Sequence, residues 1–179
     1  MYPAAQPDRG SKTISFVGCN SAVAPLGVGT WAWGDRDTWG MGGYDSALTE
    51  ASIEQAWDAS LAAGVTLFDT AEIYGKGESE RIIGKLLASD PERKSSVLIA
   101  TKFIPLPHKP RLRTAMRTAV LGSLERLGLG CIDLYQIHGP ISLRTHAAMA
   151  DALATIHSEG LIRAVGVSNY SIREMSSIQ

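Results

Sequence analysis

Short apolar runs rich in β-branched and aromatic residues recur along the chain. Such runs predict short buried strands. We expect five of them, over Leu26–Trp31, Thr66–Thr70, Val97–Lys102, Ile132–His138 and Ala164–Ser168. Because the runs are apolar throughout and do not alternate with polar residues, both faces of the sheet that they form should be covered.

The stretches between these runs carry apolar residues at the three- and four-residue spacing of an α-helix, and each ends near a glycine. The stripes are Ile53, Ala56, Trp57 and Leu61 before Gly64; Met116, Val120, Leu124 and Leu127 before Gly128; and Met149, Leu153 and Ile156 before Gly160. A shorter helix is predicted over Glu80–Ala88 with Ser79 as its N-cap. The pairs Ser52 with Gln55 and Ser171 with Glu174 look like capping boxes.

Strict alternation of strands and helices predicts parallel pairing and an α/β fold. A doubly wound sheet and a (β/α) barrel both satisfy this pattern. The segment from Gly27 to Ala32 reads G-V-G-T-W-A, which begins like a dinucleotide-binding G-x-G-x-x-G motif but lacks the third glycine. A long aromatic loop follows in place of a helix, so the doubly wound interpretation is the weaker one.

Composition adds few constraints. The chain has 179 residues, 45% of them hydrophobic, and a formal net charge of −1. This balance is typical of one soluble globular domain and gives no electrostatic footprint for nucleic acid or an anionic membrane surface. We interpret the densest basic run, Lys109–Arg117, as a solvated loop and helix face.

The cysteines and the N-terminus point to an ordinary cytoplasmic protein. Cys19 and Cys131 form no C-x-x-C pair and have no histidine at metal-ligand spacing, so we expect reduced thiols and no metal site. Met1–Thr13 is polar and lacks the apolar core of a signal peptide, so it is expected to be a flexible tail. No apolar run approaches the roughly 20 residues that span a bilayer.

Candidate chemistry lies where the predicted strands end. Four polar residues occur at or just after the C-terminal ends of three consecutive strands, namely Asp69, Tyr74, Lys102 and His138. In a parallel barrel these ends meet on one face, which holds the active site. Each residue alone has a structural interpretation, as a helix cap, a loop aromatic, a solvated strand end or a hydrogen-bonded histidine. Charged groups seldom end three successive buried strands without a partner, so the combination favours a shared site.

These four side chains suit the reduction of a carbonyl group, which needs a hydride donor and an acid for the developing alkoxide. Tyr74 would be the acid, and the Lys102 ammonium would lower its pKa toward neutrality. Asp69 would pair with Lys102, and His138 would orient the substrate oxygen. No side chain supplies a hydride, so a redox cofactor is required.

Longer motifs occur in the order and spacing of one known family. The segment from Gly64 to Gly75 reads G-V-T-L-F-D-T-A-E-I-Y-G, and E-S-E-R-I-I-G follows from Glu78. I-A-T-K ends at Lys102, D-L-Y-Q-I-H ends at His138 and G-L-I-R-A-V-G-V-S-N ends at Asn169. On these motifs the chain, from about Ile14 to its end, resembles the aldo-keto reductase family.

The resemblance implies a TIM-type (β/α)8 barrel, represented here by about five βα units over residues 14–179. An N-terminal β-hairpin, built from Ile14–Val17 and Ala22–Ala24, would cap the bottom of that barrel. Strands six to eight, together with the family's site for the adenosine end of NADPH, would lie beyond Gln179, and the first and fifth strands would form open edges.

The resemblance also implies site residues. Asp69, Tyr74, Lys102 and His138 correspond to the family's catalytic tetrad, with Tyr74 as the general acid. The family's contacts to NADPH correspond to Gly29, Thr30, Trp31, Asp69, Ser168 and Asn169. Of these, Ser168 and Asn169 match the pair that binds the nicotinamide carboxamide.

Substrate recognition is expected from Trp33, Tyr74 and His138. The aromatic loop Trp31–Leu48 is interpreted either as the rim of an apolar substrate pocket or as a small cluster that packs the loop down. The expected function is NADPH-dependent reduction of an aldehyde or ketone. The alternatives are a cofactor-sensing regulatory barrel, like the potassium-channel β-subunits of this family, and an inactive fragment.

Overall fold

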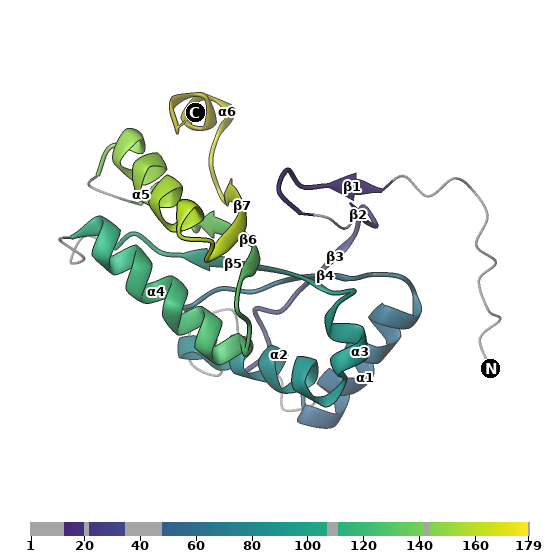
Figure 1. Ribbon diagram of the computed structural model, residues 1–179. Coiled ribbons are helices and arrows are strands. Elements are labelled where there is room, and N and C mark those ends of the chain that lie inside the picture. Colours follow the sequence, from purple (N-terminus) through teal and green to yellow (C-terminus); the bar gives the residue numbers. More distant parts are fainter. Residues whose placement is uncertain (1–12, 20–21, 35–47, 107–110, 142–143, 179) are drawn as a thin grey trace.

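The computed structural model describes residues 13–19, 22–34, 48–106, 111–141 and 144–178. Its central element is a parallel sheet in which five strands lie in sequence order (Figure 1). The strands are β3 Gly27–Gly29, β4 Leu67–Asp69, β5 Leu98–Phe103, β6 Ile132–Ile137 and β7 Ile162–Val167. All five predicted strands are confirmed, and β3 and β7 are the edges of the sheet, as expected for consecutive βα units.

Helices follow the strands in the predicted order. They are α1 Glu50–Ala62, α2 Glu78–Ser89, α3 Pro91–Lys94, α4 Leu112–Leu127, α5 His146–Ser158 and α6 Ile172–Ile178, with the 3-10 turn η1 at Tyr74–Gly77. In Figure 1, α1, α2, α4 and α5 lie along one side of the sheet. None of the helices within the described ranges is both long and apolar enough to cross a membrane.

Two predicted helix starts are wrong. Helix α1 begins after Thr49, whose side chain accepts a hydrogen bond from the Ser52 amide while Ser52 Oγ accepts one from the Thr49 amide. Ser52 is therefore the third residue of the helix and not its cap. Helix α2 follows Gly77, and Ser79 is buried inside its first turn, where it binds Thr30 and Thr70. The predicted Ser171–Glu174 box is confirmed, because Glu174 Oε2 accepts from the Ser171 amide and Ser171 Oγ from the Glu174 amide.

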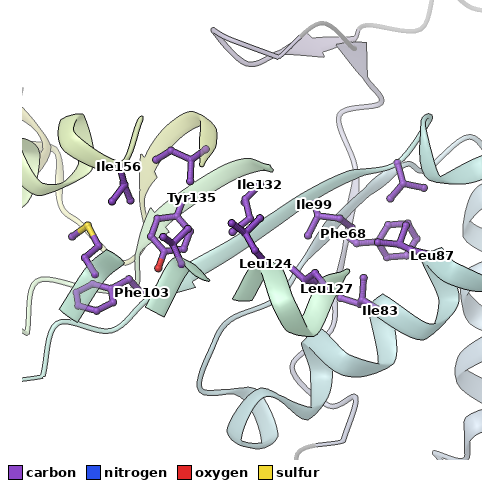
Figure 2. Packing of buried hydrophobic residues seen from close by; sticks show 14 of the residues in the cluster. Phe68, Ile83, Leu87, Ile99, Phe103, Leu124, Leu127, Ile132, Tyr135 and Ile156 are labelled. Carbon is purple, nitrogen blue, oxygen red and sulfur yellow. The ribbon is translucent and has the colours of Figure 1, made fainter. Parts of the chain in front are cut away.

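The main hydrophobic core lies between the sheet and these helices. Figure 2 shows Phe68 and Ile99 of the strands beside the helical side chains Ile83 and Leu127, with Phe103 at the other end of the same cluster. These five side chains are fully buried or nearly so. The core confirms that the apolar stripes predicted for the helices face the sheet, except that Ala56 of the first stripe is exposed.

The opposite face of the sheet is covered at one end by a two-stranded hairpin. Strand β1 Ile14–Ser15 pairs antiparallel with β2 Ala22–Val23, as the sequence predicts. Val23 is buried in a smaller cluster with Leu98 and Leu134. The Cys19 thiol donates to the carbonyl oxygen of Asp133 at 3.2 Å. The hairpin thus packs on the face of the sheet that lies opposite the main core.

Some expectations lie outside the described residues. These are the predicted tail over residues 1–12, the start of the basic run at Lys109, and the loop side chains Trp39, Met41 and Tyr44.

Candidate active site

Three inner-facing side chains from consecutive strands meet at the C-terminal end of the sheet. Asp69 ends β4, Lys102 lies near the end of β5, and Gln136 is the register partner of Lys102 on β6. The strands place these side chains on the face opposite the main core because successive residues of a strand point to opposite sides. The result is a polar layer directly above the small apolar cluster of the hairpin.

Lys102 is the centre of this layer and is only 4% exposed. Its ammonium donates to Asp69 Oδ2 at 2.6 Å and to the Thr70 carbonyl oxygen at 2.8 Å. It also reaches the Tyr74 hydroxyl at 3.4 Å, slightly beyond the usual range of about 2.7–3.2 Å. The structure therefore places Lys102 between Asp69 and Tyr74, where the sequence analysis expected it.

Tyr74 is presented by a tight turn immediately after β4. The next three residues, Gly75, Lys76 and Gly77, all have positive φ angles of 56°, 56° and 88°. Lys76 is a non-glycine residue in the left-handed region, which costs on the order of 1 kcal/mol. Its amide donates to the Ile73 carbonyl oxygen at 3.1 Å, which helps to hold the turn. The turn aims the phenol back toward the end of β5.

Below the turn, a buried hydroxyl cluster fixes the end of β4. Thr30 donates to the Asp69 carbonyl oxygen from its amide at 2.9 Å and from its hydroxyl at 3.0 Å. Ser79 Oγ lies 2.8 Å from Thr30 Oγ1 and 2.9 Å from Thr70 Oγ1. These contacts tie β3, β4 and α2 together, so the backbone that carries Asp69 is rigidly held.

His138 follows β6 and faces Tyr74. The two rings meet edge to face with centroids 5.5 Å apart. The His138 amide extends the sheet by donating to the Phe103 carbonyl oxygen at 2.9 Å. Its Nδ1 atom is buried and has no hydrogen-bond partner among the described residues. A buried ring nitrogen without a partner costs free energy in the folded chain.

Burial dominates the electrostatics of the site. It lowers the pKa of Lys102, and the adjacent Asp69 carboxylate opposes that effect. Burial, together with the charge on Lys102, lowers the pKa of His138 to about 4, so the ring is neutral at pH 7. Burial, with a smaller contribution from Asp69, raises the pKa of Tyr74 to about 12. The expected lowering of the Tyr74 pKa by Lys102 is not found in this structure, because burial and the Asp69 charge both raise that pKa.

An open cleft of about 370 Å³ lies over the Tyr74 hydroxyl. Its walls include Trp31, Ile104, His138 and Ile141. Trp31 packs near Tyr74 with ring centroids 6.4 Å apart. The cleft is thus mainly apolar, and Tyr74, His138 and Asn169 supply its polar side chains.

The other predicted site residues lie in the main core, in the buried hydroxyl cluster and at the cleft. Trp33 is 5% exposed and packs on Phe68 in the main core, so it does not line this cleft, and Trp31 takes that position. Thr30 is fully buried and its hydroxyl is used within the protein. Asn169 lines the cleft with a φ of 61°, and its side-chain amide donates to the His138 carbonyl oxygen and to Ser168 Oγ, each at 3.3 Å.

The sequence analysis missed Gln136. Its side-chain amide donates to Asp69 Oδ1 at 3.1 Å, on the carboxylate oxygen that Lys102 leaves free. A signal was available, because Gln136 is an amide within a largely apolar strand and precedes His138 by two residues. That spacing puts both on the same face of the strand.

Residues 25–179 match the sequence model of the aldo/keto reductase family. The chain belongs to the aldo-keto reductases. It is 35% identical over 170 residues to the chloroplastic pyridoxal reductase of Arabidopsis thaliana, covering 88% of this chain and 44% of that protein. It is also 35% identical to the aldo-keto reductase YhdN of Bacillus subtilis, covering 86% and 46%.

Solved structures agree with this assignment. The crystal structure of an aldo-keto reductase from Klebsiella pneumoniae in complex with NADPH superposes with a TM-score of 0.76 at 28% identity. The match covers 94% of this aldo-keto reductase chain and 53% of the Klebsiella chain. The five strands are therefore part of a (β/α)8 barrel, and the chain spans about half the length of the relatives that it matches.

Proposed function

We propose that this chain carries the catalytic and nicotinamide-binding side of an NADPH-dependent reductase that converts an aldehyde or ketone to an alcohol. The observation that carries the proposal is the buried Lys102 ammonium, held between the Asp69 carboxylate and the hydroxyl of Tyr74, a residue that lines an apolar cleft. Membership of an oxidoreductase family agrees with that chemistry.

The residues at the cleft fit a nicotinamide. Asn169 offers an amide and Ser168 a hydroxyl at the end of β7, a donor and acceptor set that complements a carboxamide. A Cβ atom added at Gly29 would meet nothing within 4 Å, so the backbone of β3 is open to close approach by a ligand. When bound, NADPH would supply the hydride.

Tyr74 would donate the proton to the substrate oxygen. Its pKa of about 12 keeps the phenol protonated at neutral pH, so the proton is present when it is needed. An alkoxide is a much stronger base than a phenolate, so transfer to it is downhill even from a weakly acidic phenol. The Lys102 ammonium at 3.4 Å would then stabilise the phenolate that remains.

His138 would orient the substrate. As a neutral imidazole it can donate one hydrogen bond to the carbonyl oxygen without competing for the proton. Its ring packs edge to face on Tyr74 and both side chains line the same cleft, so one carbonyl oxygen could contact both. The apolar walls would exclude water and accept the remainder of a small carbonyl compound.

The test compares this chain with a completed barrel, in which the C-terminal half of the Bacillus subtilis relative follows Gln179. NADPH binding is measured by fluorescence, and NADPH oxidation is measured with 4-nitrobenzaldehyde. Turnover by the completed barrel supports the proposal. Tight binding of NADPH without turnover would instead indicate a cofactor-sensing barrel, and absence of both would overturn the proposal.

A further inference from the structure

The Asp69 carboxylate is held by two different donors. Lys102 binds Oδ2 at 2.6 Å and the Gln136 amide binds Oδ1 at 3.1 Å. The Asp69 side chain is 37% exposed, so packing alone does not fix the rotation of its carboxylate group. Two donors on opposite oxygens define that rotation, since neither oxygen can move without breaking a hydrogen bond.

The neighbouring strand leaves room for the Gln136 side chain. Gly166 on β7 is the register partner of Gln136. A Cβ atom at Gly166 would lie 3.2 Å from Gln136 Cγ and 3.4 Å from Leu134 Cδ1. Glycine inside a strand is unfavourable, and here the close approach of the Gln136 side chain accounts for it.

We propose that Gln136 is a positioning residue, which orients the Asp69 carboxylate so that Lys102 is held against the Tyr74 hydroxyl. Its catalytic consequence rests on the reductase function proposed above, whereas its effect on Lys102 does not. A neutral amide suits this task because it fixes the carboxylate without neutralising it, and the full negative charge stays available to Lys102.

The pKa of Lys102 provides a measurable test of the proposal. Burial lowers the Lys102 pKa and the Asp69 carboxylate raises it, so the balance depends on how closely the carboxylate is held. If Asp69 is free to rotate, its mean distance from the ammonium increases and its attraction falls. The Lys102 pKa should then drop further, and the cation should be lost at a lower pH.

The variant Gln136→Met removes the amide donor and conserves side-chain length. Its matched control is Leu134→Met, which introduces the same side chain two residues earlier on the same face, at a residue that makes no hydrogen bond to Asp69. In the full chain labelled with 13Cε-lysine, NMR titration should show a Lys102 pKa lower by at least about half a unit in Gln136→Met than in the unsubstituted chain. Leu134→Met should leave it unchanged.

Kinetics in the completed barrel provide the second readout. Gln136→Met should lower kcat by about tenfold with KM changed less than about twofold, because the side chain does not touch the cleft residues that hold substrate. The high-pH limb of the kcat profile should move to lower pH together with the Lys102 pKa. If the unsubstituted barrel shows no turnover, the reductase proposal fails. The NMR titration of Lys102 would still test the role of Gln136.

A second perturbation covers the case in which Gln136→Met does not fold. Gly166→Ala keeps the amide but pushes on Gln136 Cγ, so it should also lower the Lys102 pKa. An unchanged Lys102 pKa in the folded variants, or an equal change in Leu134→Met, would overturn the proposal.

Discussion

The Tyr74 hydroxyl lies close to one cation and one anion, and the burial of its ring decides its acidity. The sequence predicts the convergence of Asp69, Tyr74, Lys102 and His138, because parallel strands end on one face. It does not predict the direction of the Tyr74 pKa, which depends on how much water reaches the phenol. That quantity follows from the walls of the cleft, to which Trp31 and Ile104 contribute from separate strands and loops.

Replacing Tyr74 tests the proton donor. Tyr74→Phe removes the hydroxyl and changes little else in size, so kcat of the completed barrel should fall by about 10² or more. NADPH affinity should be preserved, since Ser168 and Asn169 are unchanged. Tyr135→Phe is the matched control, because the Tyr135 hydroxyl is buried in the main core with no hydrogen-bond partner among the described residues. Similar losses of kcat in both variants would contradict the assignment of Tyr74.

The neutral state of His138 predicts a pH dependence of stability. Its pKa of about 4 lies below the ordinary value near 6.5, so the folded chain disfavours the protonated ring. Above about pH 6.5 the ring is neutral in both states. As the pH falls from there toward 4, the unfolded chain takes up a proton that the folded chain does not, and stability is lost.

Urea unfolding at pH 7 and pH 5 checks this effect. The free energy of unfolding should fall less over this interval in His138→Gln than in the unsubstituted chain, because glutamine does not titrate. His157→Gln, at an exposed position on α5, serves as the control and should behave like the unsubstituted chain. An identical pH dependence in all three proteins would show that His138 is not desolvated.

Among the elements, strands and long helices were predictable and helix starts were not. One face of α4 is buried, so apolar residues recur there at helical spacing, as at Met116, Val120 and Leu124. This spacing made α4 predictable from the sequence. Capping depends on single residues that compete, and Thr49 caps α1 although Ser52 carries the same type of side chain. Serine is a common N-cap residue, but Ser79 lies inside the first turn of α2, where its hydroxyl contacts Thr30 and Thr70. The four-residue helix α3 is too short to show a period.

The packing of α2 on α4 depends on a close approach at Gly84. A Cβ atom there would collide with the backbone carbonyl oxygen of Arg126 and crowd the Leu127 backbone. Gly84→Ala should therefore destabilise the fold by about 1–3 kcal/mol despite the higher helix propensity of alanine. In Gly122→Ala the nearest atom is the tip of the flexible Arg126 side chain, so the loss should be smaller or absent. Chemical denaturation of both variants measures the difference, and equal losses would contradict it.

In the molecule as a whole, the order of the strands followed from the sequence and the polar layer between them did not. Alternation of strands and helices predicts parallel pairing, and the resemblance to the aldo-keto reductases adds the sequential order of a barrel. The contact of Gln136 with Asp69 depends on the stagger of β6 relative to β4, which register and curvature set. No local sequence pattern encodes that stagger. The fold was therefore predictable from the sequence, whereas the hydrogen bond from Gln136 to Asp69 was not.

Docking of the hairpin on the sheet should depend on Val23. Val23→Ala removes buried apolar atoms and should cost about 1–3 kcal/mol of stability. Ile14→Ala, at its cross-strand partner, should cost much less because Ile14 is 46% exposed. In a Cys131→Ser background, Cys19 should react faster with a thiol reagent only in Val23→Ala. Equal rates in both variants would indicate that Val23 does not hold the hairpin down.

The placement of this hairpin also affects how the chain is made. The hydrogen bond from Cys19 to Asp133 spans 114 residues of the chain. At translation rates of about 5–20 residues per second, synthesis of the strands that Val23 packs against follows that of Val23 by on the order of ten seconds. Contacts between residues so far apart in sequence are slow to form, so we expect the hairpin to dock on the sheet only after the neighbouring βα units have folded.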